Sequence, residues 1–536
     1  MLLHQAIARC LRAHGVEVIF GLIGDGNLYV VDSFCREQGR YISFANETGA
    51  VVAAGAYAQV SSGIGVATVT HGPGLTNTVT ALVESVKART PLLLIAGDTA
   101  VVDSHHLQNV DQRAIVVSTG AGFEQLRSPS TVTADVATAI RRALVERRPI
   151  VLNVPIDLQW FDVDWQPADV MRPIQPTMGP DAEALDSAVG FIASARRPVI
   201  VAGRGAANPA SRASLLKLAD RLGAPVATTL RAKDLFRGCR YNLDICGTLS
   251  HQVAAEVITA SDCVLVFGAR MHIFTTMNGG LVPPQKVLHI SDDPSIVNQS
   301  VTSRFGIIGN PALVADTFVE MLDVLGTESS GYANDDLAAR ISEVTEAQDS
   351  DLLSAGSLEI KAALRLIDRA FPRDRMLVVD GGRVLSHAYK LLHVETPQGY
   401  VHSFNSGSIG LGLGTALGAA VAAPGYPVLL ACGDGSFMID GLAEFNTAVR
   451  HRLDIVVVVL NDGSYGAEYA MLKRRDMDPA LSLFDWPDLG PVATALGGQG
   501  FTVRTQAELE TALAVIERRD RPILIDIKLD PAKLTW

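Results

Sequence analysis

Cysteines are few in this chain and never occur in pairs. Six are scattered among 536 residues, in apolar surroundings, and none is spaced as in a zinc knuckle. This distribution also argues against the disulfide framework of a secreted protein. We therefore expect the six to be reduced core residues: Cys10, Cys35, Cys239, Cys246, Cys263 and Cys432.

Blocks of like charge and long apolar runs are also missing. The formal net charge is -12, without a basic segment, which argues against a nucleic-acid or anionic-membrane partner. Apolar runs such as Ile455–Leu460 fall far short of the roughly 20 residues of a membrane helix. His4, Arg9 and Arg12 interrupt the apolar N-terminal segment, which is typical of an amphipathic helix rather than a signal peptide. We expect a cytoplasmic protein that acts on small molecules.

What the chain does have is an alternation of Val/Ile-rich strands with helix-patterned segments, in three stretches. Its 48% hydrophobic content and 47 glycines are typical of α/β layers, and its length predicts about three domains. The sequence therefore predicts three α/β domains with doubly wound parallel sheets. The boundaries that we predict are 1–165, 181–327 and 357–536, with a linker at Trp165–Pro180 and a polar stretch after residue 325.

Two Gly-Asp-Gly loops follow predicted strands, where ligands bind in parallel sheets. In the second, Gly433-Asp434-Gly435-Ser436 follows PVLLAC, and the next strand ends at Asn461, 27 residues after Asp434. A carboxylate, an amide oxygen and the carbonyl of Gly463 form half of an octahedron, which two phosphate oxygens and a water would complete around Mg²⁺. Either loop alone is equally consistent with an ordinary turn.

The spacing from Asp434 to Asn461 resembles the diphosphate and magnesium signature of thiamine diphosphate enzymes. Further segments are similar, in order along nearly the whole chain, to those of the acetolactate synthase, pyruvate oxidase and pyruvate decarboxylase superfamily. They are GVEVIFGLIGDGN, NETGAVVAAGAYAQVSSGIGVATVTHGPGLTN, RPIVLNVPID, RPVIVAGRGA, DCVLVFGAR and GSIGLGLGTALGAA. The resemblance implies pyrimidine-binding, central nucleotide-binding-like and diphosphate-binding domains. It gives Asp25, in the first Gly-Asp-Gly loop, no ligand role.

The resemblance also implies roles for individual residues. Glu47 corresponds to the family glutamate that forms a hydrogen bond with the aminopyrimidine ring of the cofactor. The alternative interpretation of Glu47 is an acid that only stabilises the start of a helix. Asn46 departs from the histidine that many relatives have before this glutamate. Ile409 occupies the place of the bulky residue under the bend of the cofactor. The implied cofactor-binding residues are Gly72, Asn77, Gly382, Arg383, Ile409, Gly433, Asp434, Gly435, Ser436, Asn461, Gly463 and Tyr465, with Asp434, Asn461 and Gly463 also holding the metal. Arg383 is equally consistent with a surface residue.

In this superfamily, each active site is shared between two subunits. One subunit contacts the pyrimidine ring of the cofactor and the other contacts its diphosphate. The resemblance thus implies a homodimer or a dimer of dimers, which would be a homotetramer.

The resemblance also bears on the residues that would line the substrate, Ala467 and Glu468 among them. Simple pyruvate decarboxylases have a glutamate where this chain has Ala467, and Glu468 is one position off, which disfavours plain aldehyde release. His105 and His106 resemble the decarboxylase histidine pair, whereas Leu107-Gln108-Asn109 resembles a run of acetolactate synthases. We prefer Gln108 as a catalytic hydrogen-bond donor, with His71 and His106 as further catalytic candidates; a structural role for either histidine is the alternative.

The segment GARMHIFTT lacks the charged cluster of acetolactate synthases, which argues against acetolactate itself as the product. The central domain resembles those that hold FAD, although flavin-free relatives share its segments. We predict a thiamine diphosphate- and Mg²⁺-dependent carboligase or lyase that acts on a 2-keto acid, with an aldehyde or keto acceptor. The alternatives are a CoA-linked, oxalyl-CoA decarboxylase-like lyase, with Arg204 and Arg270 toward an ADP moiety, and a non-catalytic nucleotide-binding regulator.

Overall fold

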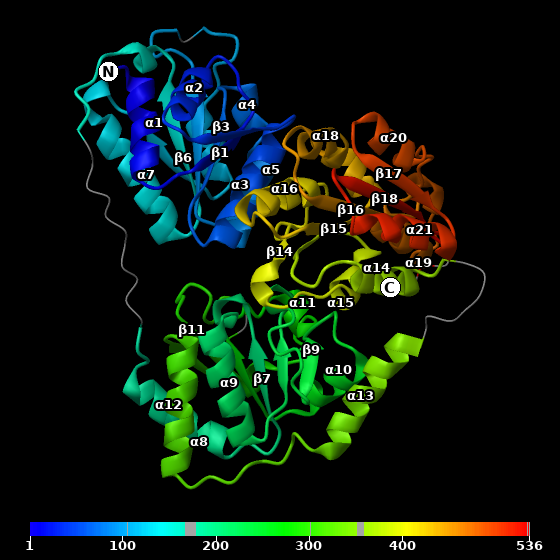
Figure 1. The fold of residues 1–536 in the computed structure, drawn as a ribbon. Coiled ribbons are helices and arrows are strands. Elements are labelled where there is room, and N and C mark those ends of the chain that lie inside the picture. The colour runs from blue at the N-terminus through cyan, green and yellow to red at the C-terminus, as the bar shows by residue number, and fades with distance from the viewer. Residues whose placement is uncertain (104, 167–177, 301, 351–357, 533, 535–536) are drawn as a thin grey trace. The chain divides into compact units, whose positions relative to one another are not determined.

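The computed structural model describes residues 1–103, 105–166, 178–300, 302–350, 358–532 and 534 (Figure 1). It contains three six-stranded sheets, which confirms the predicted fold class. The chain forms two compact units, one of Met1–Ile174, Ser357–Ala388 and Val401–Trp536, and one of Gln175–Gly356 and Tyr389–Tyr400. The boundaries 1–165, 181–327 and 357–536 stay predictions, and most of the predicted linker Trp165–Pro180 lies outside the described residues.

The first sheet has the strand order β2-β1-β3-β4-β6-β5, and every pair is parallel. Its strands are β1 (Val18–Gly21), β2 (Arg40–Ser43), β3 (Gly65–Val69), β4 (Leu92–Asp98), β5 (Gly122–Gln125) and β6 (Pro149–Pro155). Its helices are α1 (Leu3–Ala13), α2 (Leu28–Arg36), α3 (Glu47–Ser61), α4 (Pro73–Thr76), α5 (Val79–Ala88), α6 (Gln112–Ser118) and α7 (Val132–Glu146).

The second sheet forms the other compact unit, with the order β12-β11-β10-β7-β8-β9 and parallel pairs throughout. Its strands are β7 (Pro198–Ala202), β8 (Val226–Thr228), β9 (Asn242–Ile245), β10 (Cys263–Phe267), β11 (Val287–Ser291) and β12 (Phe305–Ile308). Its helices are α8 (Ala182–Ala193), α9 (Pro209–Leu222), α10 (Gln252–Ala260), α11 (Ile273–Thr276), α12 (Pro311–Val324) and α13 (Asp335–Ser350).

The third sheet has the order β14-β13-β15-β16-β18-β17, with parallel ladders from β13 to β17. Its strands are β13 (Met376–Val379), β14 (Tyr400–His402), β15 (Val428–Gly433), β16 (Ile455–Asn461), β17 (Gln499–Val503) and β18 (Ile523–Lys528). Its helices are α14 (Ile360–Ala370), α15 (Leu385–Leu391), α16 (Gly412–Ala422), α17 (Asp434–Ser436), α18 (Leu442–Arg450), α19 (Gly466–Arg474), α20 (Leu489–Ala495) and α21 (Gln506–Ile516).

Both faces of the sheets are buried, which explains the continuous apolar strands. In β1, Ile19 packs into one core cluster and Phe20 into another. In β7, Val199 and Ile200 likewise belong to different clusters. A strand covered on two sides must be apolar at every position, as the sequence pattern indicated.

Helices α3 and α16 join the first and third sheets through a close crossing (Figure 1). Small residues permit it: a Cβ added at Gly418 would lie 2.1 Å from the carbonyl oxygen of Ala53, and one at Gly414 would lie 3.0 Å from that of Gly49. The backbones of the two helices therefore approach more closely than larger side chains would allow. This crossing fixes α3, which begins at Glu47, against the third sheet.

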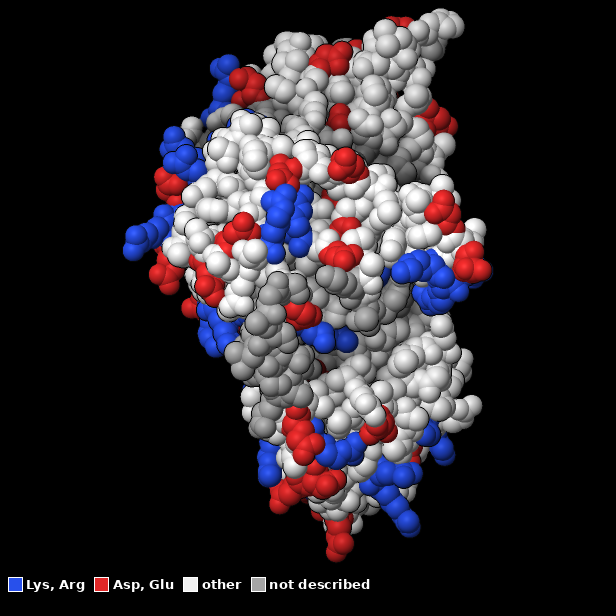
Figure 2. Space-filling model, turned by 90° about the vertical axis from the view of Figure 1, so that its right-hand side faces the viewer, with Lys and Arg blue, Asp and Glu red and all other residues white. Residues whose placement is uncertain are grey.

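The surface carries mixed charge. On the face in Figure 2, acidic and basic side chains are interspersed, without a large patch of one sign. Within the part of the chain that the structure describes, no helix is long and apolar enough to cross a membrane.

The α3–α16 crossing makes a prediction about stability. Gly418→Ala should destabilise the protein by about 1–3 kcal/mol, because its methyl group would collide with a backbone carbonyl that cannot move aside. Gly190→Ala in α8 is the matched control, since no atom lies within 4 Å of its added Cβ. The control should raise stability by up to about 1 kcal/mol through helix propensity. Thermal unfolding of both variants measures this; equal midpoints would contradict the account.

Candidate functional site

The carboxyl ends of β15 and β16 lie side by side in the third sheet. Gly433 is paired with Leu460 in the parallel ladder, so the next residues, Asp434 and Asn461, emerge at the same edge. Asp434 begins α17 and is 1% exposed. The structure therefore brings together the two side chains that the sequence predicted as metal ligands.

Asp434 lies in surroundings that suit a cation. Burial and the nearby charge of Asp462 raise the pKa of Asp434 to about 7. Its Oδ2 accepts a hydrogen bond from the Trp486 indole at 2.8 Å. A divalent ion would stabilise the ionised carboxylate at neutral pH. Among the described residues no group of three or more His, Cys, Asp or Glu side chains is arranged to hold a metal ion, so this mixed oxygen set must be judged on its own geometry.

Asn461 and Gly463 complete the predicted donor set. The Asn461 amide nitrogen donates to Asp526 Oδ1 at 2.8 Å, and its Oδ1 accepts from the Gly463 amide at 3.2 Å. Gly463 has a φ of 62°, which favours glycine, and its carbonyl accepts from the Phe484 amide at 2.8 Å. Each of the two oxygens retains a second lone pair. The chemistry of the donors thus fits a hard cation such as Mg²⁺.

Sequence reasoning missed Asp380, which organises the loop beside Asp434. Fully buried at the end of β13, it accepts hydrogen bonds through Oδ2 from the amides of Gly410, at 3.2 Å, and Gly412, at 3.1 Å, and from the Ser436 hydroxyl. Burial raises its pKa despite these bonds. Asp380 thus joins the loop that carries half-buried Ile409 to the Gly-Asp-Gly-Ser turn. The signal was an acid directly after a strand, in VVDGG.

The remaining C-terminal candidates surround this turn. Tyr465 covers Gly435, where an added Cβ would lie 2.6 Å from the ring, whereas nothing lies within 4 Å of one at Gly433. Gly382 is exposed, with a φ of 132°. On α19, Ala467 is half-buried and Glu468 is exposed.

Arg383 is buried, so the surface alternative is wrong. Its Nη2 donates to Asp462 Oδ2 at 3.0 Å, and its guanidinium lies 5.6 Å from the centre of the Tyr469 ring. Its buried Nε has no hydrogen-bond partner among the described residues. The arginine therefore forms a buried ion pair with Asp462 directly after β16.

Glu47 is the first residue of α3 and is 8% exposed. Its Oε2 accepts a hydrogen bond from the Asn77 amide at 3.0 Å, so two predicted cofactor residues are in contact. Asn46 caps the helix by accepting from the Thr48 amide at 2.8 Å. Asn46, which stands where many relatives have histidine, thus serves here as the N-cap of α3.

His71 and His106 meet at the start of α4, with ring centroids 5.4 Å apart. His71 is 1% exposed, and neither of its ring nitrogens has a hydrogen-bond partner among the described residues. Its Nε2 lies 3.8 Å from Asp25 Oδ1, which accepts hydrogen bonds from the Gly26 amide and the Thr70 hydroxyl. Asp25 thus stabilises its own turn.

Gly72 and Gln108 are also close. An added Cβ at Gly72, where φ is 59°, would lie 2.4 Å from the Gln108 carbonyl oxygen. The Gly72 amide donates to Gln112 at 2.9 Å. His105, by contrast, is exposed. The structure therefore groups His71, His106, Gly72 and the backbone of Gln108.

Comparison with known proteins decides the family. Three family models match successive parts of the chain: the thiamine pyrophosphate enzyme N-terminal TPP binding domain at residues 1–115, its central domain at 185–318 and its C-terminal TPP binding domain at 380–527. The chain belongs to the thiamine pyrophosphate enzymes.

Relatives of this thiamine pyrophosphate enzyme align along nearly its whole length. A probable acetolactate synthase large subunit of Methanococcus aeolicus is 25% identical, over 98% of this chain and 92% of its own. A sulfoacetaldehyde acetyltransferase of Alcaligenes xylosoxydans xylosoxydans is 27% identical, over 93% and 87%. An acetolactate synthase of Mycobacterium bovis is 26% identical, over 99% and 88%. These findings confirm an acetolactate synthase-like, thiamine diphosphate-dependent transferase or lyase.

Glu444 is a further residue of the enzyme that sequence reasoning missed. This α18 side chain is 0% exposed, and its Oε1 accepts hydrogen bonds from the amides of Ala45, at 3.1 Å, and Asn46, at 2.9 Å. Burial is the main cause that raises its pKa to about 7. The residue ties the third sheet to the backbone just before Glu47.

Glu444 predicts a pH dependence of stability. The folded state binds its proton between the ordinary pKa of 4.5 and about 7, whereas the unfolded state releases it. Stability should therefore fall as pH rises through this window, by at most about 1.4 kcal/mol per unit from this group. The Glu444→Gln variant keeps an acceptor oxygen but cannot titrate. Its stability should therefore fall less than that of the wild type between pH 5 and 7. Unfolding of the wild type, this variant and the exposed control Glu320→Gln measures it; three identical pH profiles would refute the assignment.

Proposed function

We propose that this enzyme uses thiamine diphosphate with Mg²⁺ to decarboxylate or cleave a 2-keto acid and to transfer the acyl group to an aldehyde or keto acceptor. The observation that carries the proposal is the oxygen donor set at the ends of β15 and β16, within the C-terminal TPP binding domain. The names of the relatives, acetolactate synthase and sulfoacetaldehyde acetyltransferase, support acyl transfer over plain aldehyde release.

Asp434, Asn461 and the carbonyl of Gly463 would hold Mg²⁺ and, through it, the diphosphate. Buried Arg383, which is paired with Asp462, would offer its Nε–H nearby as a hydrogen-bond donor. When bound, thiamine diphosphate would supply a thiazolium ring whose carbon attacks keto carbonyls and whose positive charge accepts the electron pair released on decarboxylation.

Glu47 would share a proton with the aminopyrimidine ring through Oε1, because the Asn77 amide already donates to Oε2. Because this carboxyl group is buried, water is excluded from it. A hydrogen bond between the carboxyl group and a nitrogen of the aminopyrimidine ring would be strong where water does not compete. His71 offers two ring nitrogens without protein partners among the described residues. His71, together with Gln108 and His106, would orient the bound substrate. Ala467 and Glu468 would also line the substrate site.

Partners and location extend the proposal. The family pattern supports a homodimer or dimer of dimers, and a cytoplasmic location is a further part of the proposal. FAD, or a CoA-linked substrate held by Arg204 and Arg270, is the alternative occupant of the central sheet. The ranges 1–165, 181–327 and 357–536 are the proposed domains.

Glu47→Gln tests the function. Turnover of every accepted keto acid should fall by about 10²–10⁴-fold, because amide nitrogen replaces an oxygen that must carry a proton. Carbon dioxide release from pyruvate and from longer and aromatic keto acids, with and without aldehyde acceptors, measures it. Thiamine diphosphate binding should persist in the variant.

The matched control is Glu183→Gln, an acid in the first turn of α8. If both glutamates only stabilise the helix dipole, both variants will retain full turnover, and the role of Glu47 is wrong.

Metal removal tests the donor set. Treatment with EDTA should abolish calorimetric binding of thiamine diphosphate, and Mg²⁺ should restore it, because the ion links Asp434 to the diphosphate. In the Asp434→Ala variant, Mg²⁺ should not restore the binding of thiamine diphosphate. Full binding by the stripped protein would refute the assignment.

A further inference from the structure

The segment Phe484–Leu489 is hydrogen-bonded to two of the proposed metal ligands directly and to the third through Asp526. The Phe484 amide donates to the Gly463 carbonyl, the Trp486 indole donates to Asp434 Oδ2, and the Leu489 amide donates to Asp526 Oδ2, at 2.8, 2.8 and 2.9 Å. Asp526 in turn accepts from the Asn461 amide. Six consecutive residues thus reach every ligand directly or through one carboxylate.

These bonds leave specific atoms of the ligands for the ion. Trp486 donates to Asp434 Oδ2, which leaves Oδ1 and the second lone pair of Oδ2 as possible donors to the ion. The Asn461 side-chain nitrogen donates to Asp526. This bond fixes the amide group so that the Asn461 Oδ1 atom points away from Asp526. Outer partners of this kind fix the orientation of a ligand before the ion arrives.

Trp486 is itself held by aromatic contacts. Its ring stacks on Phe484, with centroids 4.8 Å apart and an interplanar angle of 13°. Phe484 in turn meets the edge of Tyr465 at 4.7 Å, and Tyr465 covers Gly435. The indole N–H therefore reaches Asp434 from a fixed ring.

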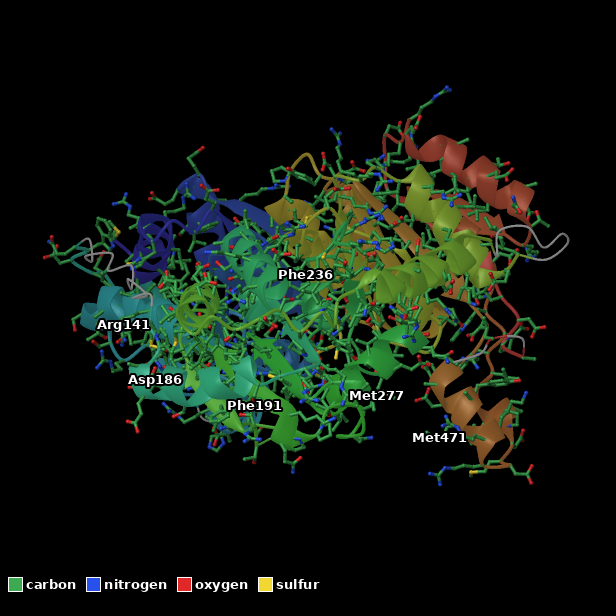
Figure 3. All side chains as sticks on the ribbon, turned by 90° about the horizontal axis from the view of Figure 1, so that it is seen from below. Arg141, Asp186, Phe191, Phe236, Met277 and Met471 are labelled. Carbon is green, nitrogen blue, oxygen red and sulfur yellow. The ribbon has the colours of Figure 1, made fainter. Side chains whose placement is uncertain are left out.

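The same segment directly follows a long connection, residues 464–483, that includes α19. Residues 464–483 leave the sheet and return, and their ends are joined by the Ser464–Leu483 bridge and a 2.9 Å bond from the Tyr465 amide to the Ser482 carbonyl. Between them lies α19, with Met471 at the periphery of the view in Figure 3. The proposed ligand Gly463 directly precedes this connection, and Phe484 directly follows it.

We propose that Phe484–Leu489 is the outer shell of the metal site and that Trp486 is a positioning residue, which orients Asp434 for Mg²⁺ through its indole N–H. This inference rests on the proposed function. It makes Trp486 a built-in reporter, because the indole contacts a ligand of the ion.

Intrinsic fluorescence tests the proposal on the full chain, stripped with EDTA and supplied with thiamine diphosphate. Titration of the wild type with Mg²⁺ should change tryptophan emission. Trp486→Phe keeps the stacked ring and removes the N–H; it should lose this signal and bind Mg²⁺ about 10–100-fold more weakly by calorimetry. Trp160→Phe is the matched control, since that tryptophan contacts Tyr29 and His4 in the first sheet's domain, and it should behave as the wild type.

The outcomes separate the two proposals. If the wild type takes up no Mg²⁺ by calorimetry, the proposed function fails and the outer shell fails with it. If the wild type binds Mg²⁺ but Trp486→Phe binds within twofold of it, only the outer shell is refuted. Should Trp486→Phe fail to fold, a protein with Trp160, Trp165 and Trp536 all changed to Phe gives the same test: a Mg²⁺-dependent signal supports the proposal, and a constant signal refutes it.

Discussion

The parallel pairing of β15 with β16 is the constraint on which the proposed site depends. Register in a parallel ladder brings residues 27 apart in the chain to the same edge, so Asp434 and Asn461 lie together without any direct bond between them. Both strands are wholly apolar before this edge and buried on two faces. The core thus fixes the position of two polar side chains, and an ion would be bound by a preformed set of oxygens rather than by a loop that must fold around it.

Much of this arrangement could be predicted from the sequence because the ends of buried strands are marked by a change of residue type. One apolar run stops at Gly-Asp-Gly and another stops at Asn-Asp-Gly, and these two stops indicate Asp434 and Asn461 as ligands. The alternation of strands and helices likewise predicted three parallel sheets. The whole-chain resemblance predicted the thiamine diphosphate chemistry that the family models confirm.

What the sequence could not predict are contacts between segments far apart in the chain. Glu444 reaches the amides of Ala45 and Asn46 across about 400 residues, and nothing in LAEFNTAV distinguishes it from a surface acid. Trp486 lies in a stretch without strand or helix pattern, yet its indole contacts Asp434. Arg383 was equally consistent with a cofactor-binding and a surface residue, and its burial beside Asp462 excludes the surface. Such partners depend on tertiary packing, which periodicity does not encode.

An experimental structure of the protein grown with thiamine diphosphate and Mg²⁺ is the most direct test of the account. It should show the ion at about 2.0–2.1 Å from an Asp434 oxygen, the Asn461 amide oxygen and the Gly463 carbonyl, in octahedral geometry with diphosphate oxygens. An ion or diphosphate bound elsewhere, with these three oxygens left to water, would contradict it.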